Sequence, residues 1–494
     1  MPVILFVPIA FPILLGAVSL FRGASWLRRF SGVVSSASIL GSGIVAVVLG
    51  NGESAPASLG GILRADALSA YMLAVVGAVG LVATWGGLVA READAAVHVE
   101  PGGAPRGMYA ALICVFLSAM SLAVLADNLG VMWVAIEATT IATAFLVGHN
   151  RTPRSLEAAW KYVVLAPAGV AIAFLGIVLI YASSTGTPTP TLSWVALIQM
   201  HVHLDPGLVR VGAALAVLGF ATKAGLAPMH SWLPDAHSQA PAPVSALMSG
   251  VLLSVALYSI LRIQAVANAV IGPEFLRALL VAGSLLSLAI AAALLLRQRD
   301  YKRMLAYSSI EHMGVMALGA AIGPIVLPAV LLYILSHGLI KACLFVLSGR
   351  LLAIEGTPII AGVRSLLTRR PGLAVPWLIG IVALLGFPPF GIFFAEVAIV
   401  LAGWAAGMGV IMAVALALML IIFAGITRLT VGMLFGSADP PDTLSAPAPA
   451  PDRSPHGPMV PLVLALGACA IIPFVSGPIG TMLVNAAAAL SRTR

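Results

Sequence analysis

Residues 129–148 read LGVMWVAIEATTIATAFLVG, an apolar run long enough to cross a bilayer, with a single acid, Glu137, near its middle. Three further apolar runs carry one charged residue in the same way: VGAALAVLGFATKAGLAP (211–228) with Lys223, LLYILSHGLIKACLFVL (331–347) with Lys341, and GIFFAEVAIVLAG (391–403) with Glu396. A charge at mid-bilayer costs about 2.5–3.5 kcal/mol on insertion scales. Four such costs, of both signs, indicate charges that the protein uses to move protons or other ions.

The composition places the whole chain in the membrane. Of its 494 residues 61% are hydrophobic and only 9% are charged, with a mean hydropathy of +1.07. A soluble protein has about 25% charged residues. At about 20 apolar residues per span we expect an all-α integral membrane protein with roughly fourteen transmembrane helices, because the runs are too long for barrel strands.

We attribute the net charge of +8 to basic residues in the loops, whose positions indicate the membrane topology. Lysine and arginine concentrate in alternate loops, for example at Arg28, Arg29, Arg151, Arg154, Arg297, Arg299, Lys302 and Arg303. The positive-inside rule places these loops in the cytoplasm, so we expect a multi-pass protein of the cell membrane with both termini on the outer side. The chain lacks interleaved basic and aromatic stretches, which argues against a nucleic-acid partner. Residues 1–21 have no basic residue before their apolar core, so we expect a retained first span rather than a cleaved signal peptide.

No motif for a bound cofactor or metal is present. The three cysteines, Cys114, Cys343 and Cys469, stand singly in apolar runs and are read as small buried hydrophobic residues. The sequence has no phosphate-binding loop, dinucleotide fingerprint, nucleophile elbow or iron–sulfur pattern. We therefore expect no cofactor in this chain, and any redox or ATP chemistry would take place in other proteins.

Two interrupted spans point to internal symmetry. LGFATKAGLAP (218–228) and LLGFPPFGIFFAE (384–396) each place Gly-Phe near a proline and an ionisable residue. Proline breaks a helix and leaves carbonyls without a donor. Matching interruptions in two halves are typical of inverted-repeat transporters. Proline kinks without a role in transport are the alternative.

The mid-span charges form two candidate pairs. Glu137 with Lys223 is the first, and Lys341 with Glu396 is the same arrangement in the second half. The protonation of a buried carboxylate or lysine depends on which charged partner lies near it, so a lysine that changes partners is a charge-controlled proton site. A static buried ion pair is the alternative, but such a pair is costly and not clearly stabilising.

Further titratable residues extend these pairs. His337 precedes Lys341 by four residues and shares its helical face. Lys161 either joins the proton chain or extends to the membrane interface. Other candidates are His312 for proton transfer, and for entry or exit Glu311, His230, Asp235, His237 and Arg428. The group of His230, Asp235 and His237 fits no strong metal motif and is read as a wet entrance or loop packing, whereas Arg428 is either an exit group or a charge paired with a neighbour.

Three stretches carry a family resemblance: KAGLAPMHSWLPDAHSQAPAPVSALMSG (223–250), YKRMLAYSSIEHMG (301–314) and SHGLIKACLF (336–345). They resemble the proton-conducting antiporter-like membrane subunits of respiratory complex I and of Mrp-type sodium/proton antiporters. The combination of SALMSG and SSIEHMG is most similar to the component F type of hydrogenase-4, of group 4 membrane-bound NiFe hydrogenases. The resemblance extends from about residue 110 to about residue 435.

The resemblance implies roles and boundaries. Glu137, Lys223, Lys341 and Glu396 match the family's intramembrane acid and lysine positions. Two inverted five-helix repeats are implied, which gives an N-terminal three-helix segment (1–107), a first repeat (108–264), a second repeat (273–436), a Pro-rich linker (437–458) and a C-terminal helix (459–494). Ser249 departs from complex I subunits, which usually have a histidine there, so a water wire or His312 is needed to join the two pairs. The chain also lacks the long lateral helix of the most distal complex I subunit.

Three functions follow as hypotheses. The first is a proton-translocating, non-catalytic subunit of a redox-driven membrane complex, whose partners are other membrane subunits and a peripheral arm of NiFe hydrogenase and iron–sulfur proteins. The second is a subunit of an Mrp-type sodium/proton antiporter without redox chemistry. The third is a structural anchor that conducts nothing, which the four mid-span charges argue against.

Overall fold

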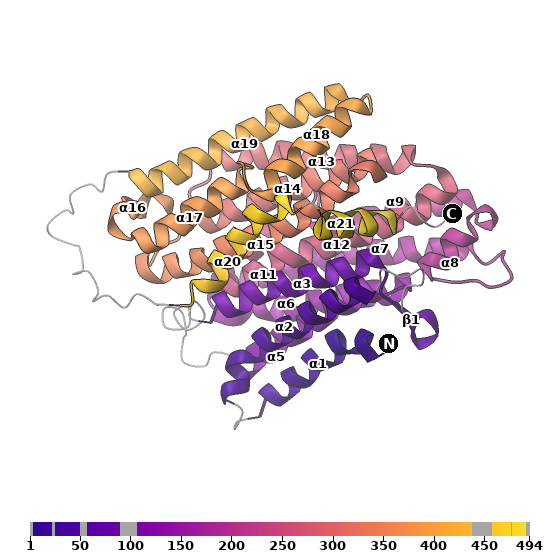
Figure 1. Ribbon diagram of the computed structural model, residues 1–494, viewed down its shortest axis with the longest axis horizontal. Coiled ribbons are helices and arrows are strands. Elements are labelled where there is room, and N and C mark those ends of the chain that lie inside the picture. Colours follow the sequence, from indigo (N-terminus) through magenta and orange to yellow (C-terminus); the bar gives the residue numbers. More distant parts are fainter. Residues whose placement is uncertain are drawn as a thin grey trace.

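The computed structural model describes residues 3–21, 25–49, 57–88, 106–436, 457–475 and 477–490, and these residues form a bundle of helices (Figure 1). The all-α expectation is confirmed. The strands of the described part are two short antiparallel segments, β1 (Ala57–Ser58) and β2 (Leu63–Arg64). Most of the predicted Pro-rich linker (437–458) lies outside the described residues.

The helices follow one another along the described chain. In chain order they are α1 (Val3–Ser19), α2 (Ser25–Leu49), α3 (Ala67–Gly86), α5 (Arg106–Leu125), α6 (Leu129–Val147), α7 (Pro153–Ser183), α8 (Trp194–Gln199), α9 (Pro206–Ala224), α10 (Trp232–Gln239), α11 (Ala242–Leu247), the π-helical η4 (Met248–Leu252), α12 (Leu253–Ile271), α13 (Glu274–Leu295), α14 (Tyr301–Ile322), α15 (Leu327–Glu355), α16 (Leu366–Arg369), α17 (Pro371–Leu384), α18 (Gly391–Ala405), α19 (Gly409–Phe435), α20 (Val460–Ile471) and α21 (Pro478–Ala488).

Ten of the described helices are long and apolar enough to cross a membrane, or eleven if the bent pair of α20 and α21 is one span. Helices α1, α17 and α18 are apolar but shorter, and α14 carries Lys302, Arg303 and Glu311. The multi-pass membrane character is thus confirmed, whereas the count of fourteen, the boundaries of the two repeats and the outer location of the termini remain predictions.

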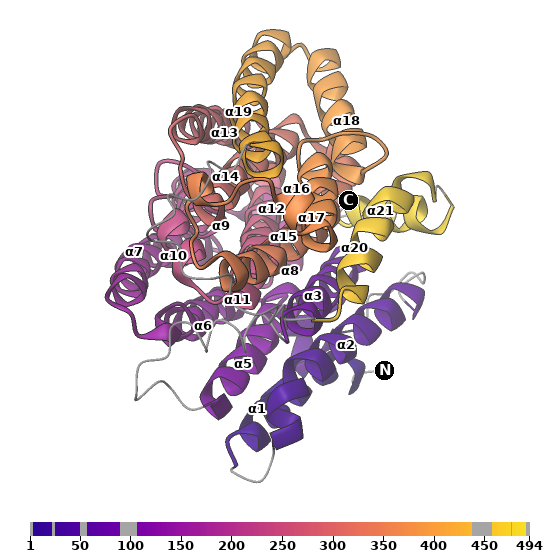
Figure 2. The same cartoon turned by 90° about the vertical axis from the view of Figure 1, so that its left-hand side faces the viewer.

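Burial separates a central set of helices from a lipid-facing set. In the apolar, membrane-crossing stretch over α11 and α12, 100% of the residues are buried. The share is 89% in the stretch that contains α15 and only 28% in that of α19. Figure 2 shows α11, α12 and α15 in the middle of the bundle, with α1, α2 and α5 on one side and α18 and α19 on the other. Apart from Arg428, the exposed residues of α19 are apolar, including Val410, Leu420 and Phe435, as expected for contact with lipid.

Both predicted helix breaks are confirmed. The chain leaves α9 at Gly225, which has a φ of 75°, and resumes in α10; it leaves α17 through Gly386, with a φ of 67°, and resumes in α18. Glycine adopts this left-handed conformation without the steric cost that a side chain imposes. Each break therefore leaves a charged residue, Lys223 or Glu396, close to a helix end inside the bundle.

The central helices touch backbone to backbone where α15 passes η4. A Cβ added at Gly338 would lie 2.7 Å from the carbonyl oxygen of Gly250, and one added at Gly250 would lie 2.8 Å from that of Gly338. Two glycines therefore allow the π-helical segment to pack directly against α15. His337 is next to this crossing point, so its position depends on the close packing.

Replacing Gly338 with alanine is expected to destabilise the protein by about 1–3 kcal/mol, because the new methyl group forces the two backbones apart. The measurement is the thermal unfolding midpoint of the purified protein in detergent. Gly432→Ala in α19 is the matched control, since a Cβ there meets nothing within 4 Å. Equal midpoints for the two variants would contradict the packing argument.

Candidate functional site

The first cluster centres on Lys223, whose side chain is fully buried in the last turn of α9. Its Nζ donates to the hydroxyl of Thr140 at 2.7 Å and to that of Tyr162 at 2.6 Å. The Thr140 hydroxyl in turn donates to Oε2 of Glu137 at 3.3 Å. The predicted pair of Glu137 and Lys223 is thus brought together, with Thr140 between them rather than as a direct ion pair.

Local structure holds Lys223 in place. The last turn of a helix carries partial negative charge from its free carbonyls, which favours a cation. Gly225 ends α9 just beyond the lysine, and the indole Nε1 of Trp232 donates to the carbonyl oxygen of Thr222 at 2.9 Å. Tyr162 is further fixed by its hydrogen bond to Thr143 at 2.7 Å. The ammonium group therefore sits in a preformed polar pocket within an apolar bundle.

The second cluster centres on Lys341 in α15. Its Nζ donates to the carbonyl oxygen of Leu305 at 2.6 Å and to the hydroxyl of Ser308, both in α14. Lys341 does not pair directly with Glu396 as the sequence suggested, and its hydrogen bonds go to α14 instead. The predicted Lys341–Glu396 pair is therefore corrected: the two residues belong to one cluster in which other side chains lie between them.

Glu396 closes this cluster. The Tyr333 hydroxyl donates to Oε1 of Glu396 at 2.7 Å and lies 2.7 Å from Nδ1 of His312. Since the single phenolic hydrogen goes to Glu396, Nδ1 of His312 is the donor to Tyr333. The rings of His312 and His337 are 5.2 Å apart, and His337 lies one turn before Lys341. A path of titratable groups thus joins Lys341 to Glu396.

His237 lies between the two clusters. The sequence suggested either a wet entrance or loop packing for this residue. Its side chain is fully buried, which agrees with packing, and a part in proton entry or exit remains a prediction. Its ring centroid is 5.9 Å from Trp232 and 5.9 Å from Phe345, and Trp232 is itself 4.9 Å from Tyr162. Within the described residues, no side chain hydrogen-bonds to either ring nitrogen of His237, and the backbone of Leu233, one turn earlier in α10, interacts with the ring. This leaves one ring nitrogen for water or a passing proton.

Ser249 lies at the same level of the bundle. Its hydroxyl is 2.8 Å from that of Ser309, which neighbours the Lys341 partner Ser308. Ser249 thus offers a hydroxyl rather than a titratable ring. His237 supplies the buried imidazole between the two pairs, in addition to the more distant His312.

Four of the predicted site residues, beginning with Lys161 and Asp235, lie outside the two clusters. Lys161 has a 46% exposed side chain and forms ion pairs with Glu157 at 2.7 Å and Asp235 at 3.1 Å, and Asp235 also binds Arg303 at 2.8 Å. Lys161 is therefore a partly exposed, ion-paired lysine, and its extension to the membrane interface remains a prediction. Its part in proton transfer remains a prediction.

The other two predicted residues outside the clusters are His230 and Arg428. His230 is partly buried at the break after α9. Arg428 is exposed and donates to the carbonyl oxygen of Leu296 at 3.0 Å, and both of its suggested roles remain predictions.

Sequence reasoning missed four hydroxyl groups at the site, those of Thr140, Tyr162, Ser308 and Tyr333. A signal was available for Tyr333, which precedes His337 by four residues and Lys341 by eight, on one helical face. Thr140 follows Glu137 by three residues and likewise shares its face. Ser308 likewise precedes Glu311 by three residues and His312 by four on α14, whereas Tyr162 has no charged residue three or four positions away on its own helix.

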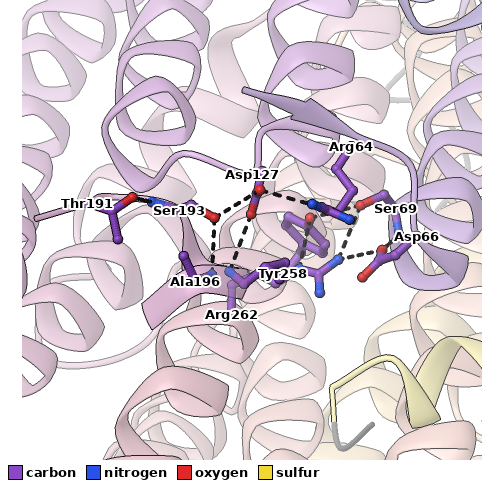
Figure 3. A network of polar contacts seen from close by, with 10 residues as sticks. Arg64, Asp66, Ser69, Asp127, Thr191, Ser193, Ala196, Tyr258 and Arg262 are labelled. Atoms are coloured by element: carbon purple, nitrogen blue, oxygen red, sulfur yellow. Dashed lines mark hydrogen bonds and ion pairs between the residues drawn. The ribbon is translucent and has the colours of Figure 1, made fainter. Parts of the chain in front are cut away.

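A second buried polar network lies at the start of α3, shown in Figure 3. Arg262 of α12 is fully buried and donates to Oδ1 of Asp66 at 2.6 Å and to the hydroxyls of Ser69 and Tyr258 at 3.1 and 3.0 Å. Its guanidinium lies 4.0 Å from the ring centroid of Trp194. This network, absent from the sequence-based candidates, links α3, α8 and α12.

The comparisons with known proteins agree with this architecture. A bundle of broken helices with buried lysines and acids defines a class of ion-translocating membrane subunits. The family model "NADH:quinone oxidoreductase/Mrp antiporter, TM" matches residues 126–422, which is more than half of the chain. The chain therefore belongs to this family, and the family resemblance found in the sequence is confirmed.

Among curated relatives, the hydrogenase-4 component F homolog of Methylacidiphilum infernorum (isolate V4) is 41% identical over 295 residues, covering 58% of this chain and 61% of that protein. This confirms the similarity to component F. Across three such relatives the match spans between 50% and 61% of the relative's own length.

Two solved structures share the fold. A chain of the membrane-bound sulfane sulfur reductase, an archaeal respiratory membrane complex, superposes with a TM-score of 0.84 at 24% identity, covering 100% of this chain and 97% of that one. A chain of the Mrp complex from Dietzia sp. DQ12-45-1b gives a TM-score of 0.83 at 22% identity, covering 100% and 98%. Both neighbours are parts of membrane complexes with several subunits.

Proposed function

We propose that this chain is the proton-translocating, non-catalytic membrane subunit of a redox-driven complex of the membrane-bound hydrogenase type or a related oxidoreductase. One observation carries the proposal: two clusters of titratable and hydroxyl side chains lie in the bundle with the buried His237 between them. The first cluster has Glu137, Thr140 and Lys223, and the second has Lys341, His337, His312, Tyr333 and Glu396. Taken in this order, these residues are the proposed proton line. Buried ionisable groups of this kind mark ion pathways in membrane proteins.

The geometry suggests how charge moves along this line. Lys223 holds its proton among two hydroxyls, with Glu137 one hydroxyl away. A change in charge near Glu137 would alter the stability of the ammonium group and release its proton toward His237, whose ring has no side-chain hydrogen-bond partner within the described residues. Lys341 would then receive it and pass it through the histidines to Glu396. Each step needs only small side-chain movements and bridging water.

The energy for this movement would come from partner subunits. The chain itself would hold no cofactor, and electron transfer in a peripheral arm of NiFe hydrogenase and iron–sulfur proteins would shift the charge near Glu137. The similarity to a hydrogenase-4 component F homolog supports this choice of partner. The chain would contact other membrane subunits and the lipid of the cell membrane, and both of its termini would lie on the outer side.

The test is to purify the complex in mild detergent, identify its subunits by mass spectrometry and reconstitute it in vesicles with a pH-sensitive dye. We expect co-purification of a hydrogenase or another iron–sulfur oxidoreductase, and proton movement on addition of its electron donor. A complex with redox turnover but no proton movement would refute the proposal.

A second function, a subunit of an Mrp-type sodium/proton antiporter, is supported by the shared fold with the Dietzia Mrp complex. In that case only small membrane subunits would co-purify, and proton movement would follow an imposed sodium gradient without any electron donor.

Replacing Thr140 with valine, which has nearly the same shape, removes the hydroxyl between Glu137 and Lys223. We expect the rate of coupled proton translocation to fall by about tenfold to a hundredfold, because the acid and the lysine lose their connection. Thr427→Val in α19 is the control, since its hydroxyl has no partner within the described residues. Comparable rates for the two variants would exclude Thr140 from the path.

A further inference from the structure

One arginine interrupts the lipid-facing surface of α19. Arg428 is exposed, and the residues one and two turns away on the same helical face are exposed and apolar: Ile421, Ala424, Val431 and Phe435. A charge on a face that contacts hydrocarbon is costly, so a long arginine side chain extends to the polar headgroup layer. Arg428 therefore marks the level at which this face meets lipid headgroups.

The guanidinium of Arg428 lies at the end of α13. Its Nη2 donates to the carbonyl oxygen of Leu296 at 3.0 Å. A Cβ added at Gly425 would lie 3.7 Å from the carbonyl carbon of Leu295, so α13 and α19 are in contact here, and Figures 1 and 2 show them side by side. An arginine has five N–H donors in a planar fork. Within the described residues Arg428 uses only the donor to Leu296, and the others are available to a ligand.

Two further arginines belong to the same end of the bundle. The backbone N–H of Ile360 donates to the carbonyl oxygen of Arg299 at 2.8 Å, which joins the loop after α13 to the segment before α16. In that segment, Nη1 of Arg364 lies 3.0 Å from a Cβ added at Gly436, the residue that ends α19. Arg299 and Arg364 are exposed, like Arg428. Arginines from three segments of the chain therefore lie at one rim of the helix bundle.

This rim carries positive charge without matching acids. Within the described residues, none of the three arginines forms an ion pair. The two acids that neighbour Arg299 and Arg364 in the sequence are already engaged. Asp300 accepts from backbone N–H groups in the first turn of α14 at 2.7 and 3.0 Å, and Glu355 binds Arg369 at 2.9 Å. The rim therefore favours an anion from outside the described part of the chain.

We propose that Arg299, Arg364 and Arg428 bind the phosphate group of one anionic phospholipid, whose acyl chains lie along the exposed apolar residues of α13 and α19. Arginine suits this ligand because its planar fork of donors matches the oxygens of a phosphate. Basic clusters at the ends of membrane helices attract anionic headgroups. The apolar stripe around Arg428 favours a lipid over a soluble acidic partner, because one lipid supplies both the anion and the hydrocarbon. The site does not depend on the proposed function.

The test uses the full-length protein, purified with the subunits that accompany it, in phosphatidylcholine vesicles that contain phosphatidylglycerol with a photoreactive acyl chain. Peptide mass spectrometry after illumination locates the labelled residues. We expect labelling near Val431 that added phosphatidylglycerol reduces more than the same amount of added phosphatidylcholine. Near Val410, at the other end of α19 and also exposed, the two lipids should reduce labelling equally.

Three results would overturn the proposal. If the two lipids reduce labelling near Val431 equally, the site does not select an anionic headgroup. If inorganic phosphate reduces it as strongly as phosphatidylglycerol does, the arginines bind free phosphate. If the label falls on an accompanying subunit in place of α19, the rim is a protein–protein contact.

Variants test the role of the guanidinium directly. In Arg428→Gln we expect selective labelling near Val431 to fall about fivefold, the factor that one basic residue contributes near an anionic membrane surface. Arg428→Lys keeps the charge and should retain more of the labelling, which separates loss of binding from loss of structure. Arg277→Gln changes an arginine at the other end of α13, paired with Glu274, and is the matched control. Labelling in Arg428→Gln equal to that in the control would show that Arg428 does not hold the lipid.

Discussion

Replacing Lys223 with alanine is expected to lower coupled proton translocation by about a hundredfold or more while the complex still assembles. Proton transfer by a positioned side chain contributes roughly a factor of 10² to 10⁴ to a rate. Alanine removes the ammonium group and leaves the hydroxyls of Thr140 and Tyr162 without their cation. Dye-detected proton uptake in vesicles, normalised to redox turnover, measures the effect.

The control for this variant is Arg297→Ala, which removes an exposed positive charge in the loop after α13. We expect normal uptake from it. Lys223→Arg keeps a positive charge but seldom releases its proton, so it should remain close to the alanine variant. If Lys223→Ala pumps at the wild-type ratio of protons to electrons, Lys223 does not carry the transported proton and the proposed line is wrong at its centre.

The fold was largely predictable because apolar runs and their interruptions have direct physical meaning. The runs around Glu137, Lys223 and Lys341 are too long for strands and too apolar for a soluble core, which leaves membrane helices. The prolines and glycines of residues 218–228 and 384–396 located both breaks. The number of spans was less determined, since α1, α17 and α18 are shorter than an ordinary span.

The candidate site was predictable in its charges and less so in its connections. A charge inside an apolar run is visible in the sequence, but a hydroxyl such as that of Tyr162 is ordinary there. Whether Thr140 or water separates an acid from a lysine depends on how the helices approach, which no local pattern encodes. For His237 the sequence left a wet entrance and packing as alternatives for a related reason: a Pro-rich break looks like a loop, yet this one is packed within the bundle.

Replacing Arg262 with alanine is expected to produce the largest loss of stability, about 3–5 kcal/mol. Arg262 and Asp66 form an ion pair with 0% and 12% exposed side chains, and Asp66 also caps α3 by accepting from the backbone N–H of Ser69 at 2.8 Å. Removing the guanidinium leaves a nearly buried carboxylate without a counter-ion and takes away the hydrogen bonds that Arg262 makes in Figure 3. The thermal unfolding midpoint in detergent measures the loss.

Arg277→Ala is the matched control, because Arg277 pairs with Glu274 through 34% and 78% exposed side chains. Exposed ion pairs contribute about 0–1 kcal/mol, so its midpoint should remain close to that of the wild type. Arg262→Lys should fall between the two, since it keeps the charge but loses the planar fork of donors. A midpoint for Arg262→Ala equal to that of the control would mean that water, rather than the guanidinium, supports Asp66.

The pH dependence of this loss follows from Asp66. Burial alone raises the pKa of the Asp66 carboxyl, but the Arg262 guanidinium and the donors of Ser69 outweigh it and hold the pKa below its ordinary value. A carboxyl group with a lowered pKa in the folded protein stabilises it above the ordinary pKa, about 3.9, and that stabilisation disappears as the pH falls toward the folded value. The difference in midpoint between the wild type and Arg262→Ala should therefore be largest near neutral pH and shrink below about pH 4. A difference that is constant across this range would show that Arg262 acts through packing against Trp194 and Tyr258 rather than through its charge.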